Sequence, residues 1–206
     1  MFATIYQDAQ LIVLDKPSGL LAVPGRGPDL QDCLSARVQA MLPMALVVHR
    51  LDRDTSGLMV MALTPEVQRE LSRQFAERVV EKTYVAVVHG CPRDSEGTIC
   101  LPMRKDFDRP PRHKIDPEQG RSAETHWRVL ERSSDRARLE LKPFTGRSHQ
   151  IRLHLAAIGH PILGDPLYAD GEVLAMAPRL LLHAERLEIN QPVTGERLNW
   201  RSTCPF

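Results

Sequence analysis

Residues 49–57 read His-Arg-Leu-Asp-Arg-Asp-Thr-Ser-Gly, and the apolar runs 46–48 and 58–63 flank them on both sides. The two runs are typical of buried strands, so the polar nonapeptide is expected to form a loop held by rigid core. Catalytic groups commonly lie on such loops. The charge pattern alone also fits a solvated turn, in which arginine and aspartate side chains pair on the surface.

The composition is that of an ordinary globular protein, with 42% hydrophobic and 26% charged residues. A length of 206 residues suits one domain over the whole chain, and we also expect a monomer. The N-terminus shows no basic start followed by an apolar segment, and no apolar run approaches the roughly 20 residues that span a bilayer. We therefore expect a cytoplasmic protein without membrane association. A net charge of +1 argues weakly against a nucleic-acid binder, so local charge must decide that question.

The sequence predicts no metal site. His149 and His154 are five residues apart, and the chain contains no His-Glu-x-x-His pattern. The cysteines lack C-x-x-C spacing and are expected to be reduced thiols; they are Cys33, Cys91, Cys100 and Cys204.

Apolar periodicity predicts three helices. The first covers residues 30–41, with Leu34, Val38 and Met41 on one face. The second runs to about residue 77 after Thr64 as N-cap and a proline at its first position, and it places Val67, Leu71 and Phe75 on one face. The third covers residues 148–158, with Ser148 as N-cap, Gly159 just past its end, and Ile151, Leu155 and Ile158 burying it.

Short apolar or β-branched runs predict the strands, at residues 11–14, 46–48, 58–63, 83–88, 125–130, 138–141 and 180–189. Helices and strands are mixed without strict βαβ alternation, which indicates an α+β domain around a largely antiparallel sheet. Residues 102–121, which we name the finger, contain four prolines, many charges and few apolar side chains. The finger is expected to be an exposed loop or an extended projection.

Residues 49–57 resemble the signature of the RluA family of pseudouridine synthases, and the resemblance covers nearly the whole chain. Lys-Pro-Ser-Gly at 16–19 resembles the first family motif, and Lys-Thr-Tyr-Val-Ala at 82–86 resembles the strand with the active-site tyrosine. The third block is matched at 145–154, and the C-terminal features at 159–165 and 181–184. The resemblance implies one catalytic domain over residues 1–206, without the separate N-terminal RNA-binding domain of longer relatives.

The implied reaction breaks the N1–C1′ bond of a uridine, turns the base and rejoins it through C5. Carboxylates commonly handle glycosidic bonds whose transition states resemble cations. The resemblance assigns that role to Asp52, either by attack on C1′ or by removal of the 2′ proton. The isomerisation is redox-neutral and implies no cofactor.

Two further residues are assigned catalytic roles by the resemblance. Arg152 matches the basic residue that pairs with the catalytic aspartate, and a buried carboxylate needs such a cation to stay ionised. Tyr84 matches the residue that stacks on the target uracil, a contact that contributes about 1–3 kcal/mol. Without the motifs, Arg152 would be a surface arginine and Tyr84 a core-packing side chain.

The remaining assignments concern RNA binding. Arg50 matches the family residue that contacts the flipped nucleotide or fills the space it leaves, although it also fits a partner for Asp54. Thr55 and Ser56 are expected to brace the loop through the backbone, and Gly57 permits close approach or positive φ. Residues suited to phosphate contacts complete the predicted substrate-binding set, and they are Arg109, Arg112 and Lys114 of the finger, with Arg147 and His149.

Rival functions differ in class. A non-catalytic RNA-binding protein would have no chemical need for Asp52, Tyr84 and Arg152 together, and a nucleoside hydrolase or glycosidase would need a second carboxylate that the motifs lack. The runs 16–25 and 176–185 resemble family members that act on stem-loops of both 23S rRNA and the tRNA anticodon. A relative dedicated to a different tRNA or rRNA uridine is the alternative.

Overall fold

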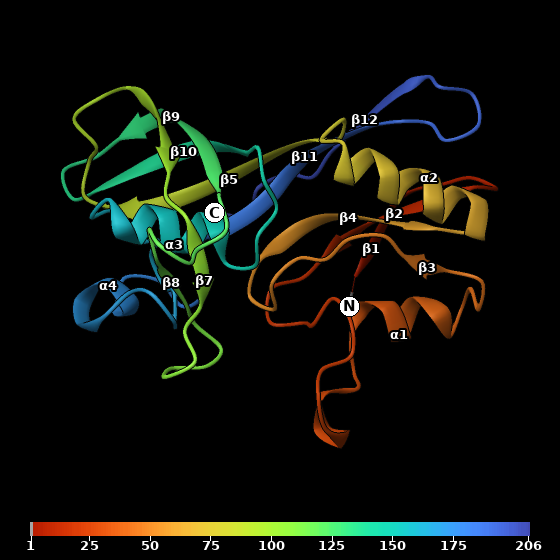
Figure 1. The fold of residues 1–206 in the computed structure, drawn as a ribbon, viewed down its shortest axis with the longest axis horizontal. Helices are drawn as coiled ribbons and strands as arrows, with labels where there is room; N and C mark the ends of the chain where they lie inside the picture. The colour runs from red at the N-terminus through yellow and green to blue at the C-terminus, as the bar shows by residue number, and fades with distance from the viewer. Residues whose placement is uncertain (1) are drawn as a thin grey trace. The chain divides into compact units, whose positions relative to one another are not determined.

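The computed structural model describes residues 2–206, which form two compact units. The first unit contains the residues up to 82 and residues 183–205, and the second contains residues 83–182 and Phe206. In Figure 1 the first unit therefore combines red to yellow N-terminal segments with the blue strands β11 and β12. Each unit joins helices to strands that pair mostly antiparallel, which confirms the predicted α+β class.

The sheet of the first unit has the neighbour order β1-β2-β4-β11-β12, and β3 pairs with β4. Its strand pairs are antiparallel except for β4 with β11, which is parallel. All residues of β4 are buried, as its continuous apolar run predicts for a central strand. The strands are β1 (Ala3–Gln7), β2 (Leu11–Lys16), β3 (Leu46–Val47), β4 (Ser56–Ala62), β11 (Leu182–Asn190) and β12 (Arg197–Arg201).

The sheet of the second unit has the order β5-β10-β9-β6, and all its pairs are antiparallel. Its core includes Leu139 and Leu141 of β10 and Leu155 of the third long helix. A separate two-stranded hairpin, β7 with β8, lies within the finger and confirms that segment as an extended projection. The strands are β5 (Glu81–His89), β6 (Glu96–Cys100), β7 (Met103–Lys105), β8 (His113–Ile115), β9 (Glu124–Arg132) and β10 (Arg136–Pro143).

The helix predicted over residues 30–41 is shorter than expected. A 3-10 turn, η1 (Pro28–Leu30), is followed by α1 (Leu34–Gln39). The helix begins only at Leu34 because Cys33 is extended and acts as the N-cap, its sulfur accepting a hydrogen bond from the amide of Ala36. Leu34 and Val38 are buried as predicted, but Met41 lies beyond the helix and is 60% exposed. The predicted second helix is confirmed as α2 (Pro65–Ala76), with the Thr64 hydroxyl accepting from the amide of Val67.

The third helix, α3 (Gln150–Ala157), begins later than predicted, so Ser148 is not its N-cap. His149 occupies that position with a left-handed φ of 58°, while the Gln150 side chain accepts the amide of Arg147 and holds the preceding turn. Gly159 follows the helix with φ +84°, as expected. Ile158, predicted to be buried, is 37% exposed because it caps the helix end.

Six strands or helices of the described residues were not predicted: the edge strands β1, β6 and β12, the finger strands β7 and β8, and the short helix α4 (Gly171–Ala175). They bury few side chains, so their sequences carry a weak apolar pattern; Ile99 is the buried residue of β6. No helix among the described residues is long and apolar enough to cross a membrane.

Candidate active site

The loop of residues 49–55 is fixed at its start by His49. The Nε2 atom of His49 accepts a hydrogen bond from the amide of Val60 at 3.1 Å, and its ring stacks on Phe75 at 4.5 Å. Burial, aided by the positive charge of Lys82, lowers the pKa of His49 to about 3. The imidazole is therefore neutral at physiological pH and, since Nε2 accepts, its proton is on Nδ1.

The middle of the loop is tied to the Lys-Pro-Ser-Gly turn that follows β2. Lys16 is fully buried, and its ammonium donates to the carbonyls of Pro17, Leu20 and Arg53 at 2.7–2.9 Å. The amide of Gly19 also donates to the Arg53 carbonyl at 3.0 Å. Three carbonyls match the three donors of an ammonium group, which satisfies a charge that would otherwise be costly to bury.

The end of the loop is fixed against β11. Gly57 has φ +113°, and an added Cβ would lie 2.3 Å from the carbonyl oxygen of Ala184. Both predictions for Gly57, positive φ and close approach, are therefore confirmed. Ser56 braces the loop as expected, but through a buried hydrogen bond of 2.9 Å between its Oγ and the Nδ1 of His183.

These three sets of contacts fix the loop that carries Asp52 and Arg50, the two predicted site residues of the first unit. Asp52 is half-buried and lies between the loop's anchored ends, and its carbonyl accepts the amide of Thr55 at 3.2 Å. Arg50, two residues earlier, is exposed. A carboxylate on a short segment that is held at three places is a preorganised group, as catalysis requires.

Arg152, in the second unit, is not a surface arginine, because its side chain is only 2% exposed. It forms a bidentate ion pair with the fully buried Asp165, with Nε–Oδ2 at 2.8 Å and Nη2–Oδ1 at 2.6 Å. The guanidinium also lies over the ring of Tyr168, 5.4 Å from its centroid. Asp165 was not predicted as a partner, although a buried arginine in an apolar helix requires a carboxylate nearby. The predicted pairing of Arg152 with Asp52 stays a prediction.

The other residues of the third family block, at 145–154, stabilise the fold. The side chain of Gln150 accepts from the Thr145 hydroxyl at 2.7 Å and donates to the hydroxyl of Thr125 and the carbonyl of Glu124, each at 2.9 Å. His154 is fully buried and hydrogen-bonds Thr125 and the carbonyl of Leu101. Desolvation lowers the pKa of His154, which keeps its ring neutral. These contacts fix α3 on the sheet and hold Arg152 in place.

Tyr84 lies on β5 opposite Leu141 of β10 and is half-buried. One part of its side chain packs on the core of the second unit, while another part reaches solvent. The core-packing and stacking interpretations are therefore compatible, since one ring can do both.

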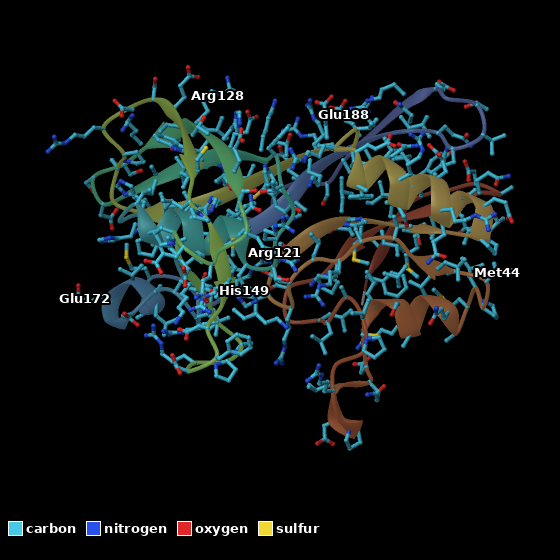
Figure 2. All side chains as sticks on the ribbon, viewed as in Figure 1. Met44, Arg121, Arg128, His149, Glu172 and Glu188 are labelled. Atoms are coloured by element: carbon cyan, nitrogen blue, oxygen red, sulfur yellow. The ribbon has the colours of Figure 1, made fainter. Side chains whose placement is uncertain are left out.

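Strand β8 of the finger is joined to α3 by an aromatic cluster. The Tyr168 hydroxyl accepts the amide of His113 in β8 at 2.8 Å and lies 3.0 Å from Nδ1 of His149. His149 is labelled in Figure 2. The rings of His113 and His149 meet edge to face at 5.1 Å. His149 thus connects the finger to the N-terminus of α3, a position that its sequence did not reveal.

Several finger cations are paired within the finger. Arg109 donates to Asp106 at 3.1 Å, and Lys114 lies 3.9 Å from Asp108. Arg112 is half-buried. Outside the finger, Arg147 is exposed and reaches the carbonyl of Ser122 at 3.4 Å.

Among residues 2–206, no group of three or more His, Cys, Asp or Glu side chains gathers closely enough to hold a metal ion. The four cysteines are free thiols, as expected.

Comparison with known proteins shows the family to which the chain belongs. The model of the RNA pseudouridylate synthase family matches residues 10–157, more than half of the chain. The dual-specificity RNA pseudouridine synthase RluA of Escherichia coli K12 is 49% identical over 203 residues, which cover 98% of this chain and 93% of the relative. The protein of the same name from Yersinia pestis is 48% identical and is covered over 98% of its length.

Solved structures show the same fold. Human RNA pseudouridylate synthase domain containing 1 has a TM-score of 0.83 and 28% identity, over all of this chain and 84% of its own. Human RNA pseudouridylate synthase domain containing 4 has a TM-score of 0.80 and 27% identity, over 98% and 88% of the two chains.

Proposed function

Since this chain belongs to the RNA pseudouridylate synthase family and is an isomerase acting on RNA, we propose that it isomerises uridines in stem-loops of both tRNA and 23S rRNA. The relatives at 45–49% identity are named as dual-specificity enzymes, and this likeness supports the double substrate. We further propose that the chain works as one catalytic domain and a monomer in the cytoplasm, where such RNAs are found.

Asp52 is the proposed catalytic carboxylate. The observation that carries this assignment is the triple anchoring of its loop by His49, Lys16 and Ser56. The reaction needs one carboxylate to act on the sugar while the N1–C1′ bond breaks. The freed uracil turns, C5 bonds to C1′ and loses its proton, and N1 takes up one proton, so the product is an isomer of the substrate. A loop backbone fixed in this way limits the positions that the Asp52 side chain can take before the substrate arrives.

Tyr84 and Arg152 complete the proposed catalytic set. Tyr84 is half-buried, and its aromatic ring is the group proposed to stack on the target uracil. Arg152 is the proposed basic partner of Asp52 in the reaction, and Asp165 orients its guanidinium through two hydrogen bonds.

RNA binding is assigned to basic side chains on both units. Arg50 contacts the flipped nucleotide, and Arg109, Arg112 and Lys114 of the finger contact phosphates together with Arg147 and His149. The exposure of Arg50, Arg109 and Arg147 supports these roles, because a phosphate can reach each of them.

Tritium release from RNA labelled at uridine C5 tests the function, with a tRNA anticodon stem-loop and a 23S rRNA stem-loop as separate substrates. The wild type is expected to release tritium from both, and Asp52→Asn from neither. Asp54→Asn is the matched control, since it removes a carboxylate from the same loop, and it should retain activity. Release by Asp52→Asn would overturn the assignment of Asp52, while release from one RNA only would leave a single-substrate enzyme. Binding of both RNAs by a wild type that releases no tritium would indicate the non-catalytic alternative.

A further inference from the structure

Phe107 is exposed in a way that fold stability does not explain. It lies in the loop of residues 106–112 that joins β7 to β8, here named the tip loop, and is 77% exposed. No other large hydrophobic side chain in the described part of the chain is exposed as much. Single surface hydrophobics are common, so exposure alone identifies no site. The surroundings of Phe107 decide the question.

Asp106 closes the tip loop through hydrogen bonds and is only 3% exposed. The carboxylate of Asp106 accepts from Arg109 Nε at 3.1 Å and from the amide of Asp108 at 3.3 Å, while its amide donates to the Arg112 carbonyl at 2.9 Å. Burial alone would raise the pKa of Asp106, but the hydrogen bonds from Arg109 and Asp108 hold it below its usual range. Phe107, next in the chain, is therefore presented by an ordered turn.

The charge around Phe107 is positive. Residues 103–115 contain five arginine or lysine side chains and two aspartates, a net charge of +3 with histidine neutral, against +1 for the whole chain. Lys105 ends β7 just before the tip loop, and Arg112 is the last residue of the loop. Within residues 2–206, neither makes an ion pair. An exposed aromatic ring in a loop that has such cations at its two ends matches a single-stranded polyanion whose bases present flat faces.

We propose that Phe107 stacks on an unpaired base of the substrate stem-loop other than the target uridine, while Lys105 and Arg112 bind the adjoining phosphates. The inference rests on the proposed function, because it assumes that the substrate is a structured RNA. A protein-binding tip is disfavoured, since a lone ring flanked by cations lacks the apolar surroundings that anchor residues in protein interfaces usually have. RNA loops do supply splayed bases that stack on aromatic side chains.

The first test measures RNA affinity and kinetics for Phe107→Ala, Phe107→Leu and Phe107→Trp. Loss of one base stack weakens binding by roughly 5- to 150-fold. We expect Phe107→Ala and Phe107→Leu to raise the Kd and KM in that range, with kcat at saturating RNA unchanged, and Phe107→Trp to bind at least as tightly as the wild type. Leu130→Ala, which trims a 46%-exposed side chain on β9, is the matched control and should not change the Kd.

The second test locates the base. Stem-loops with a single abasic nucleotide at each loop position in turn are bound to wild type and to Phe107→Ala. One abasic position is expected to weaken binding to the wild type and to have no further effect on Phe107→Ala, because the two changes remove the same contact.

If Phe107→Ala or Phe107→Leu binds RNA with the Kd of the wild type, the stacking role is overturned. An unchanged Kd for Phe107→Ala is also the result expected if the tip binds a protein. Additive effects at every abasic position would overturn it too. These outcomes rest on RNA binding alone, so they are distinguishable from failure of the proposed function, which is read from tritium release by the wild type.

Discussion

Ser56 and His183 are joined by a hydrogen bond inside the first unit, and the chain of contacts continues to the C-terminal segment. The Nε2 atom of His183 lies 3.1 Å from Ser202 Oγ, which donates to Asp15 Oδ2 at 2.6 Å. Because the Ser202 hydroxyl gives its proton to Asp15, it accepts from Nε2–H, and Nδ1 of a neutral ring accepts from Ser56. Residues far apart in sequence thus hold the end of the loop that carries Asp52.

His183→Ala is expected to lower both stability and activity. The substitution leaves the buried hydroxyls of Ser56 and Ser202 without this partner and opens a cavity. The free energy of unfolding should therefore fall by about 2–4 kcal/mol. Denaturant unfolding measures this loss, and tritium release should show a lower kcat with the Kd for RNA unchanged. His126→Ala, at a half-exposed side chain on β9, should change stability by less than about 0.5 kcal/mol. Equal stability of the two variants would contradict the role of His183.

Gly57→Ala should destabilise the chain by more than about 3 kcal/mol, because it combines an unfavourable φ with overlap against the backbone of Ala184. Gly195→Ala provides the comparison. Gly195 also has positive φ, at +75°, but an added Cβ there meets nothing within 4 Å, so its cost should be about 1 kcal/mol. If chemical denaturation finds the same loss of unfolding free energy for both variants, the close approach of Gly57 to Ala184 does not contribute to stability.

The ion pair of Arg152 and Asp165 should be costly to break from either side. Arg152→Met and Asp165→Leu each leave a buried partner, and each should lower the free energy of unfolding by about 3–5 kcal/mol. The double variant should recover part of that loss, although the amides of Leu167 and Tyr168 still lack their acceptor.

Activity separates the structural role of this pair from the chemical role of Arg152. The double variant is expected to be folded and inactive in the tritium-release assay. A double variant with wild-type kcat would show that Arg152 contributes no charge to the reaction.

Stability should fall as the pH is lowered from about 6.5 towards 3. The pKa of His49 is about 3 in the folded chain, so in this range the unfolded chain binds a proton that the folded chain does not. The loss is at most about 1.4 kcal/mol per pH unit for one histidine. Urea unfolding at pH 7 and pH 5 should show a smaller loss for His49→Gln than for wild type, since glutamine does not titrate. Parallel curves for the two proteins would contradict the lowered pKa.

The central strands of both units could be predicted because their apolar runs are buried. β2, β4 and β5 lie close to the predicted residues, and α2 was defined by its Thr64 cap and first-turn proline. Edge strands such as β6 could not, since a strand paired on one side with one buried side chain has no clear period.

The candidate site was identified by its motifs rather than by its contacts. The motifs predicted Asp52, Tyr84 and Arg152 as site residues, which stays a prediction, but they did not indicate the carboxylate that pairs with Arg152. Asp165 comes from a loop after α3, and only the fold determines which acidic side chain reaches a buried guanidinium. The left-handed φ of His149 was equally hidden, because positive φ is usual only for glycine.

The finger is attached through β8 and shaped at its tip by different contacts. The amide of His113 in β8 donates to the Tyr168 hydroxyl and attaches it, whereas Asp106 closes the seven residues of the tip loop. Changes within that loop therefore leave the attachment intact. Under the proposed role of Phe107, exchange of the tip loop with that of a relative is expected to change RNA affinity and to leave the anchored loop of Asp52 unaltered.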